Sequence, residues 1–593
     1  METIKKLLDL LSVRERKEAS LLLLMILVMA VLDMIGVASI LPFIAVLTNP
    51  QLVESNQFLA TLYSVGNFKN IEEFFFALGL IVFLILCLSL IFKAFTIYFQ
   101  LRFALLREYT IGKRLIEGYL HQPYSWFLNR HSSDLGKNIL SEVGAVISGG
   151  IMPMITVIAQ GAVTISLTVL LLIVDPLLSI LAAAILGSSY TLVYKSISKY
   201  LDFIGIERLK ANQDRFNAVS EAFGATKEVK LGALENIYLR RFSKPAQTFA
   251  YNQATAQVVA QTPRFALEGI AFGGLLLIVL YLMIQSNTFA DTLPIIALYA
   301  FAGYRLLPAL QQIYASFTQL RFAKPALDAL HSDFMGLQPI KKTPDTTKFE
   351  FKKNIVLSNI SYSYPKSERT ALTNINIDIS ANSTVGIVGM TGSGKTSTVD
   401  IILGLLVPQG GSLQVDGKII SDRNKRAWQK IIGYVPQQIY LIDDTIAANI
   451  AFGIEPQNID EDALIRAAKM SNLHNFIKNE LSSGYQTIVG ERGVRLSGGQ
   501  RQRIAIARAL YHKPKVLVFD EATSALDNLT EKIIMEAIHN LGDRITVILI
   551  AHRLSTVKVC ENIFFLENGK IRSQGSFDTL RKLDEKFSKM ANI

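Results

Sequence analysis

The chain has 593 residues, of which 50% are hydrophobic and 18% charged, with a net charge of +11 and two cysteines. This length accommodates several domains, and two cysteines give no basis for a disulfide framework. A basic chain can indicate a nucleic-acid partner. Here, however, the basic residues stand between long apolar runs and form no single tract, which favours a membrane protein with basic loops and no nucleic-acid partner.

Six apolar segments are long enough to cross the hydrocarbon core of a membrane, which takes about 20 residues. One such run could be a buried helix of a soluble protein, but six together argue against that. The segments lie near 18–42, 74–98, 151–174, 176–196, 266–287 and 292–316.

Loop charges predict the topology of these spans. Lysine and arginine are frequent in the tail before the first span and in 101–150 and 195–264, whereas the turns at 175–176 and 286–292 have neither. Because basic loops stay inside, we expect a multi-pass protein with both termini cytoplasmic. The basic stretches contain few Gly or Pro, so we expect helices that extend into the cytoplasm. The external connection 43–72 is predicted to hold a short interfacial helix within 46–70. A cleavable signal peptide is not expected.

A phosphate-binding loop follows the membrane part and a polar linker at 341–353. The pattern GxxxxGK[ST] directly follows a strand-like segment, 384–388, and precedes a helix, which is the context this loop requires. Its glycines let backbone N–H groups face phosphates, Lys395 would reach the β- and γ-phosphates, and Thr396 would ligate Mg²⁺. The loop residues are Gly389, Met390, Thr391, Gly392, Ser393, Gly394, Lys395, Thr396 and Ser397.

Two further motifs follow along the chain. In 515-KVLVFDE-521, an apolar strand ends in Asp520, predicted to hold Mg²⁺ through water, and in Glu521, predicted to polarise the attacking water. Between the loop and this strand, LSGGQ opens a helix at Ser497, Gly498, Gly499 and Gln500. The chain therefore resembles the ATP-binding cassette (ABC) family over nearly its whole length, specifically an exporter half-transporter of the type IV fold.

The resemblance implies roles for other residues. Tyr364 would stack on adenine, Gln437 would sense Mg²⁺ and the membrane domain, and His552 would contact the γ-phosphate. Glu491 matches the exporter X-loop and 524–527 the D-loop. LSGGQ would close on ATP held by a second cassette, so a dimer is implied, most simply a homodimer with two competent sites. A heterodimer remains possible in principle, although such pairs often carry one damaged site.

The expected architecture is a polytopic α-helical membrane domain at 1–340 fused to a cytoplasmic α/β P-loop cassette at 354–593. The resemblance implies two cytoplasmic coupling segments, 123–136 with Trp126 and Phe127 as candidate anchors, and 218–242. Both can also be read as plain amphipathic helices. ATP binding would shift these segments and move the spans between inward- and outward-open forms.

Three cations near or within the spans bear on the substrate: Lys93, Arg264 and Arg305. Lys93 can snorkel to the interface, and Arg305 can pair with Asp33 or Glu268. Alternatively, the three hold an anionic substrate, to which arginine is suited. The chain resembles PglK-type bacterial flippases of lipid-linked oligosaccharides, which implies an inner-membrane location and a polyprenyl-pyrophosphate glycan as substrate.

Other functions remain as alternatives. One is an exporter of drugs, peptides or a lipid A-type glycolipid, and another is an ABC-shaped regulator or channel that does not pump. The presence of both Glu521 and His552 argues against a regulator without ATPase activity. The six predicted spans exclude a soluble ABC ATPase.

Overall fold

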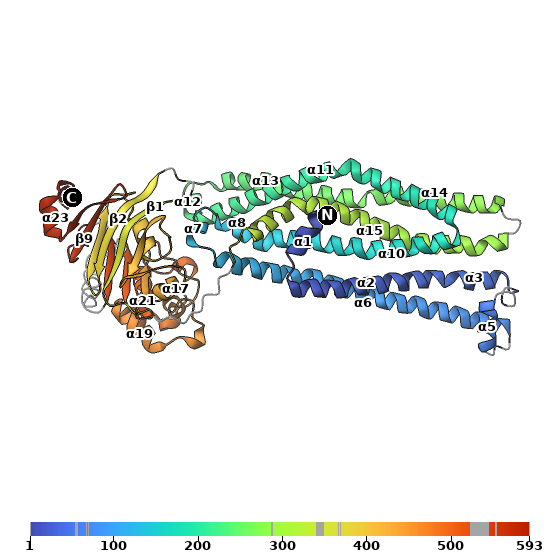
Figure 1. The fold of residues 1–593 in the computed structure, drawn as a ribbon, viewed down its shortest axis with the longest axis horizontal. Coiled ribbons are helices and arrows are strands. Elements are labelled where there is room, and N and C mark those ends of the chain that lie inside the picture. The colour runs from blue at the N-terminus through green and yellow to red at the C-terminus, as the bar shows by residue number, and fades with distance from the viewer. Residues whose placement is uncertain are drawn as a thin grey trace. The chain divides into compact units, whose positions relative to one another are not determined.

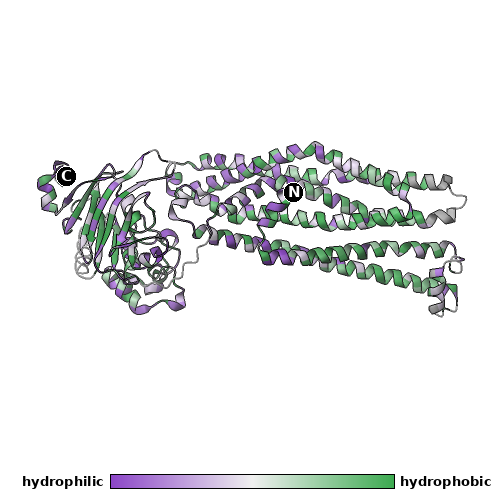
Figure 2. Cartoon of the chain, viewed as in Figure 1, coloured by the Kyte–Doolittle hydropathy of each residue, from purple (hydrophilic) through white to green (hydrophobic). Residues whose placement is uncertain are grey.

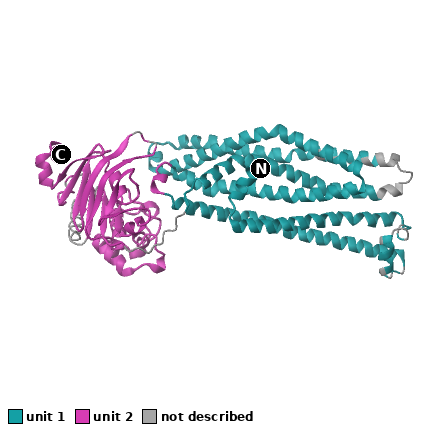
Figure 3. Ribbon diagram, in the orientation of Figure 1, with its two compact units in different colours: residues 1–122, 130–340 teal, residues 123–129, 341–593 magenta. Residues whose placement is uncertain are grey.

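The computed structural model describes residues 2–51, 53, 57–66, 68, 70–285, 289–339, 349–365, 367, 369–521, 545–551, 554 and 556–591. The chain divides into two compact units, shown in Figure 3. Residues 1–122 and 130–340 form the membrane unit, and residues 123–129 and 341–593 form the cassette unit. The predicted linker residues 341–348 lie outside the described residues.

The membrane unit is built from helices, several of them far longer than a bilayer requires (Figure 1). At about 1.5 Å per residue, the 50-residue helix α6 is roughly 75 Å long. The helices are α1 (Glu2–Asp9), α2 (Val13–Ala38), α3 (Ile40–Thr48), α5 (Gln57–Val65), α6 (Ile71–Leu120), α8 (Ser132–Lys137), α9 (Val143–Val146), α10 (Met152–Val174), α11 (Pro176–Gly224), α12 (Thr226–Leu231), α13 (Glu235–Gln261), α14 (Pro263–Gln285) and α15 (Phe289–Met335).

Four helical segments among the described residues are long and apolar enough to cross a membrane: Val13–Thr48, Ile71–Leu120, Ser132–Val174 and Pro176–Gly224. They contain the first four predicted spans. The fifth and sixth predicted spans fall on α14 and α15, which are not among these four segments, so these two spans stay predictions. In Figure 2, hydrophobic residues crowd the parts of the bundle near α3 and α14, and hydrophilic residues gather near α12 and α13.

The long helices expected from the sequence are present, and their extension into the cytoplasm stays a prediction. The helix that leads into α10 departs from regular α-helix. Two π-helical turns, η1 (Asn138–Glu142) and η2 (Ile147–Ile151), interrupt the helix that leads into α10. In the second turn, a Cβ on Gly149 would lie 2.6 Å from Cβ of Ala323 on α15. The glycine therefore allows the two backbones to approach, which apolar periodicity alone does not reveal.

The cassette unit contains two sheets. An antiparallel sheet has the order β2-β1-β4-β5 and a larger sheet the order β10-β9-β3-β8-β7-β6, in which the strands from β9 to β6 run parallel. The strands are β1 (Asn354–Ser363), β2 (Thr370–Ser380), β3 (Thr384–Gly389), β4 (Gly410–Val415), β5 (Lys418–Ile419), β6 (Ile432–Val435), β7 (Val516–Asp520), β8 (Thr546–Ala551), β9 (Asn562–Glu567) and β10 (Lys570–Gly575).

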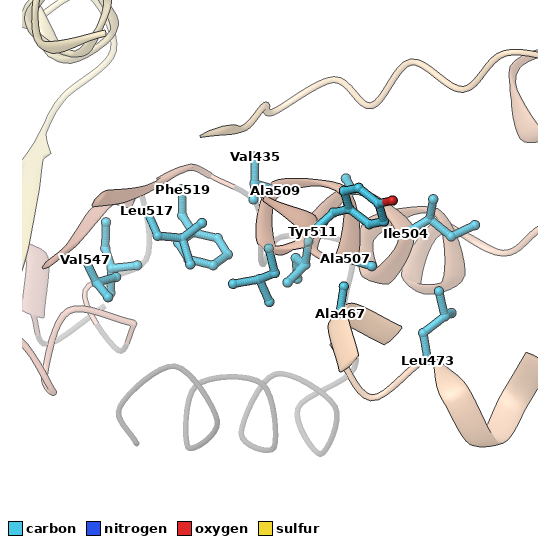
Figure 4. Packing of buried hydrophobic residues seen from close by; sticks show 14 of the residues in the cluster. Val435, Ala467, Leu473, Ile504, Ala507, Ala509, Tyr511, Leu517, Phe519 and Val547 are labelled. Carbon is cyan, nitrogen blue, oxygen red and sulfur yellow. The ribbon is translucent and has the colours of Figure 1, made fainter. Parts of the chain in front are cut away.

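Helices cover the larger sheet and complete its core. Strands β3, β7 and β8 are buried along their whole length, as expected of parallel strands covered on both faces. Figure 4 shows Leu517 and Phe519 of β7 packed in one cluster with Ala507 and Ala509 of α21. The helices and helical turns of this unit are α7 (Tyr124–Phe127), α16 (Lys395–Ile402), α17 (Lys425–Gln429), α18 (Ile446–Ile450), η3 (Pro456–Asn458), α19 (Glu461–Met470), α20 (His474–Glu480), η4 (Gly484–Gln486), η5 (Glu491–Gly493), α21 (Gly498–Tyr511), α23 (Phe577–Leu583) and α24 (Glu585–Ala591).

Candidate functional site

The loop between β3 and α16 has the conformation that a phosphate cradle needs. Gly392 and Gly394 adopt φ angles of +76° and +103°, in the region where residues with a Cβ are strained. A Cβ on Gly394 would also lie 2.7 Å from Leu372 Cδ2 and 3.0 Å from the carbonyl oxygen of Ala371. The backbone can therefore follow this path only with glycine at 394.

Polar groups inside the loop are available for an anion. The Lys395 ammonium donates to the carbonyl oxygens of Gly389 at 2.8 Å and Met390 at 3.1 Å, which holds it across the loop. Burial lowers the pKa of Lys395, against the opposing effect of Glu521 and Asp520. The Ser393 Oγ is buried without a hydrogen-bond partner. A phosphate group would supply an acceptor for the Ser393 hydroxyl and for the third N–H of the Lys395 ammonium.

A pocket of about 400 Å³ opens over this loop. It gathers the predicted adenine, phosphate and hydrolysis residues at one place, although they follow β1, β3, β6 and β7 along the chain. The lining residues are Tyr364, Ser367, Arg369, Thr370, Ala371, Thr391, Gly392, Ser393, Gly394, Lys395, Thr396, Ser397, Gln437, Glu521, Asn568 and Gly569.

Tyr364 stands at the entrance of the pocket with its ring half-buried. Its hydroxyl lies 2.9 Å from the Ser397 Oγ, and its ring meets Tyr362 edge-on with centroids 5.2 Å apart. These two contacts fix the orientation of the ring while leaving it on the pocket lining. The arrangement is compatible with the predicted stacking on a nucleotide base.

The two acids after β7 differ in their surroundings. Asp520 is buried at the end of the strand, and Tyr434 donates its hydroxyl to Asp520 Oδ2 at 3.2 Å. Glu521 has a φ of +51°, a strained conformation for a residue with a side chain, and accepts from Gln437 Nε2 at 2.6 Å. Burial and the Asp520 carboxylate raise the pKa of Asp400 to about 6. Gln437 and Glu521, both predicted from the sequence as site residues, are therefore in direct contact through this hydrogen bond from Gln437.

The oxygen donors near the pocket suit a hard cation. Thr396 offers a hydroxyl, Gln437 an amide oxygen and Asp520 a carboxylate, which is the ligand chemistry that Mg²⁺ prefers. Among the described residues there is no group of three or more His, Cys, Asp or Glu that could hold a metal.

The signature residues lie apart from this pocket. Ser497 caps α21 by accepting from the Gln500 backbone N–H at 3.2 Å, and Gln500 Oε1 accepts in return from the Ser497 N–H at 2.8 Å. This reciprocal capping box presents the helix N-terminus, with Ser497 exposed. All four signature residues are described, and none lines the pocket of its own cassette.

Other predicted cassette residues are placed only in part. Glu491 is exposed and opens the short turn η5. His552 and 524–527 lie outside the described residues. Trp126 and Phe127 lie in α7, which belongs to the cassette unit, with ring centroids 5.1 Å apart. The second predicted coupling segment spans the end of α11, the short helix α12 and the start of α13.

Two of the three predicted membrane cations converge on one acid. Asp33 of α2 is buried, and its Oδ2 lies 3.1 Å from Nζ of Lys93 on α6. Its Oδ1 lies 3.4 Å from Nη1 of Arg305 on α15 and accepts from Ser89 Oγ at 2.9 Å. The pairing of Arg305 with an internal acid, one of the alternatives open from the sequence, is therefore present. Lys93 is also paired and not simply extended to the interface.

The third cation is engaged separately. Arg264 and Glu268, one turn apart on α14, are joined at 2.5 Å between Nε and Oε1.

Sequence reasoning missed Ser89 and Tyr434. Ser89 precedes Lys93 by four residues and so shares a helix face with it, a spacing that offers a signal. Tyr434 had no comparable signal, because its partner Asp520 is far away along the chain.

Comparisons with known proteins agree with this architecture. Residues 36–304 match the ABC transporter transmembrane region, and residues 372–524 match the ABC transporter ATP-binding model. The chain is 30% identical over 489 residues to the ATP-dependent lipid A-core flippase of Haemophilus influenzae strain 86-028NP, a match covering 79% of this chain and 80% of that protein. It is 39% identical over 289 residues to the alpha-hemolysin translocation ATP-binding protein HlyB of Escherichia coli O6:H1, covering 48% of this chain and 40% of that one.

The fold also has a close structural counterpart. A bacterial Atm1-family ABC exporter with ATP bound superposes with a TM-score of 0.78 at 21% identity, covering 97% of both chains. A membrane domain fused to a nucleotide-binding cassette defines an ATP-driven transporter subunit. The chain belongs to the ABC transporter family. It is an exporter that binds ATP and couples ATP hydrolysis to transport across a membrane.

Proposed function

We propose that this exporter is a flippase for an amphipathic anionic lipid, and that it works as a homodimer in a bacterial inner membrane with both termini cytoplasmic. The first candidate substrate is a polyprenyl-pyrophosphate-linked oligosaccharide. The observation that carries the proposal is the meeting of Lys93 and Arg305 at the single carboxylate of Asp33. Two cations share one anion there, so the cluster keeps one positive charge inside a set of apolar helices.

The homodimer follows from the separation of the two nucleotide motifs. The phosphate loop lines a pocket that the signature of the same chain does not reach. A second cassette is needed to bring Ser497, Gly498, Gly499 and Gln500 to the ATP. Two identical chains provide two complete sites.

Hydrolysis is assigned to residues at the pocket. Glu521 would act on the attacking water, and Gln437, which contacts it at 2.6 Å, would orient it. Thr396, Gln437 and Asp520 would hold Mg²⁺, which neutralises phosphate charge when bound. His552, outside the described residues, is assigned to the γ-phosphate. A regulator without ATPase activity has no need of a glutamate held in this strained and bonded position.

Coupling to the spans is assigned to α7 and Glu491. The helix α7 belongs to the cassette unit, although its sequence lies between two membrane helices. On this ground we assign Trp126 and Phe127 to the transmission of motion from the cassette to the spans. ATP would favour the state in which the two cassettes close, and its hydrolysis would reverse that preference. The spans would change between inward- and outward-open forms accordingly.

The choice of a lipid substrate rests on charge and on relatives. Lys93, Arg264 and Arg305 are cations on three apolar helices, and arginine suits phosphate oxygens. Relatives with similarity over most of the chain are lipid A-core flippases, which makes a lipid A-core glycolipid the second candidate. Relatives named for protein export match about half of this chain, so peptides and drugs rank below lipids.

The decisive experiment is a substrate screen on the purified protein in proteoliposomes. Polyprenyl-pyrophosphate glycans, lipid A-core glycolipids, neutral lipids, peptides and drugs are compared for ATP-dependent flipping and for stimulation of the ATPase. We expect flipping of at least one phosphate-bearing lipid and none of the neutral lipids. Stimulation and transport by peptides or drugs alone would overturn the lipid assignment.

A further inference from the structure

Asp33 is a buried carboxylate with polar and charged partners, which the packing of apolar membrane helices does not require. Its side chain is fully buried, with 0% of its surface accessible, within the apolar part of α2 that follows Ser20. It receives Ser89 and Lys93 from α6 and faces Arg305 from α15. Removal of a carboxylate from water is expensive unless charged partners surround it. Two helices, α6 and α15, supply those partners to the acid on α2.

Accessibility differs between the acid and its two cations. The side chains of Lys93 and Arg305 keep 23% and 19% of their surface accessible, whereas Asp33 keeps none. The cations thus have an open side, and the carboxylate lies behind them. An anion that arrives from the open side meets Lys93 and Arg305 while both still interact with Asp33.

We propose that Asp33 is the built-in counter-ion of the substrate site, which holds Lys93 and Arg305 between transport cycles and competes with an anionic head group for them. The inference rests on the proposed function and adds to it a residue that determines release. Its ligand class is a phosphate-bearing lipid head group. Asp33 does not touch the substrate and acts by positioning and neutralising the two cations.

Competition has a direct consequence for the transport cycle. A lipid phosphate must share cations that are already partly neutralised, so it binds less tightly than it would to two free cations. When the phosphate leaves, the carboxylate recovers full contact with both, which lowers the free energy of the emptied site. Tight binding alone would hinder release of the lipid. A lipid that binds equally tightly to the inward- and outward-open states does not shift the equilibrium between them. Asp33 therefore lowers the affinity for the lipid and raises the rate of its release.

The test is Asp33→Asn, which keeps size and hydrogen-bonding capacity and removes the charge. Wild type and variant are reconstituted in phosphatidylethanolamine vesicles with graded amounts of polyprenyl pyrophosphate, and in a second series with lipid A. In the variant, the lipid amount that half-stimulates the ATPase should fall at least about fivefold, the lower range for coupled sites. The maximal flipping rate should fall in parallel. Asp33→Glu should restore both values toward wild type.

A damaged fold would not give this pattern, because general loss of structure lowers turnover without tightening binding. Ser89→Ala gives a second, gentler check, since it keeps every charge and frees Asp33 Oδ1 from one donor. The carboxylate then draws Arg305 more strongly, so the half-stimulating lipid amount should rise, roughly twofold for one hydrogen bond. Opposite shifts in the two variants support the counter-ion role.

The outcomes separate this inference from the proposed function. If neither lipid stimulates the wild-type protein, both are overturned. If a phosphate-bearing lipid stimulates the wild type but Asp33→Asn leaves the half-stimulating amount unchanged or raises it, only the counter-ion role is overturned. A response to lipid A and not to polyprenyl pyrophosphate, or the reverse, identifies the source of the phosphate group.

Discussion

The guanidinium of Arg305 lies 3.4 Å from the carboxylate of Asp33, so an arginine of the last long helix is paired with an acid of the first long one. An unpaired arginine in a bilayer costs about 3 kcal/mol on insertion scales. The pair lowers that cost and also links α15 to α2. Lys93 adds a second cation to the same acid, which leaves one positive charge uncompensated.

Arg305→Ala should abolish flipping of the lipid while leaving the ATPase rate without lipid near its wild-type value. The reason is that the variant removes a cation of the cluster, whereas the phosphate loop and Glu521 belong to the other unit. Flipping of polyprenyl-pyrophosphate glycan in liposomes and ATP hydrolysis are measured on the same preparation. Arg305→Lys, which keeps the charge, serves as the control. Normal flipping by Arg305→Ala would refute the role of this residue in substrate binding.

Glu521→Gln should lower ATP hydrolysis by at least about a hundredfold, the usual effect of losing a general base. ATP binding should persist, because the loop contacts of Lys395 are untouched. Phosphate release and equilibrium ATP binding are measured separately. Gln437, which donates to Glu521 in the wild type, can still meet an amide oxygen at 521, so the local geometry is kept. Hydrolysis at the wild-type rate would remove Glu521 from the catalytic assignment.

The sequence predicted the nucleotide pocket well because its residues follow the chain in fixed patterns. Glycines with a strand before them and a helix after them specify the loop locally, and the loop has that conformation at Gly392 and Gly394. The first four spans were also predictable, since length and apolarity suffice. The conformation of the loop and the position of a span are both determined by residues that are close together in the sequence.

The membrane cluster could be predicted only as a set of alternatives. Whether Arg305 meets Asp33, Glu268 or a substrate depends on how α2, α14 and α15 pack, and apolar helices carry few signals of their mutual rotation. The second π-helical turn before α10 is similar, because the close approach of its Gly149 to Ala323 on α15 is a contact between distant parts of the chain. Tyr434 meets Asp520 through the parallel pairing of β6 and β7, which a single strand pattern does not specify.

Tyr434→Phe should raise the Mg²⁺ concentration that half-activates the ATPase about tenfold, the lower end of the effect of one hydrogen bond to a charged group. The Tyr434 hydroxyl donates to Asp520 Oδ2 at 3.2 Å, which fixes the carboxylate that is proposed to hold the ion. Mg²⁺ titrations of ATP hydrolysis and of nucleotide affinity give two readouts. Tyr440→Phe is the matched control, because Tyr440 is 62% exposed and contributes its backbone oxygen, not its hydroxyl, to Arg508. Equal Mg²⁺ dependence of the two variants would exclude the positioning role.

Gly394→Ala should destabilise the cassette more than Gly392→Ala does. Both glycines have positive φ, so both variants bear a backbone strain of about 1 kcal/mol. Only at 394 would the new Cβ also press against Leu372 and the Ala371 carbonyl, whereas at 392 nothing lies within 4 Å. Thermal unfolding without nucleotide compares the two, so that contact with ATP has no influence. A smaller loss for Gly394→Ala would show that the loop relaxes away from β2.

Cys560 should resist alkylation in the native protein. Burial, and then the neighbouring Glu561, raise the pKa of this thiol to about 12, and only 5% of the residue is exposed. At pH 8 the reactive thiolate is then about one part in ten thousand, compared with roughly a quarter for an ordinary thiol. Iodoacetamide labelling of a Cys87→Ser variant isolates this residue. Labelling of Cys560 should become complete only after denaturation. In the native protein, its slow labelling rate should keep rising with pH above pH 8, whereas the rate for an ordinary cysteine levels off near pH 9. Rapid native labelling at pH 8 would show that the packing around Cys560, with Gly386 and Val557, opens far more readily than a buried core does.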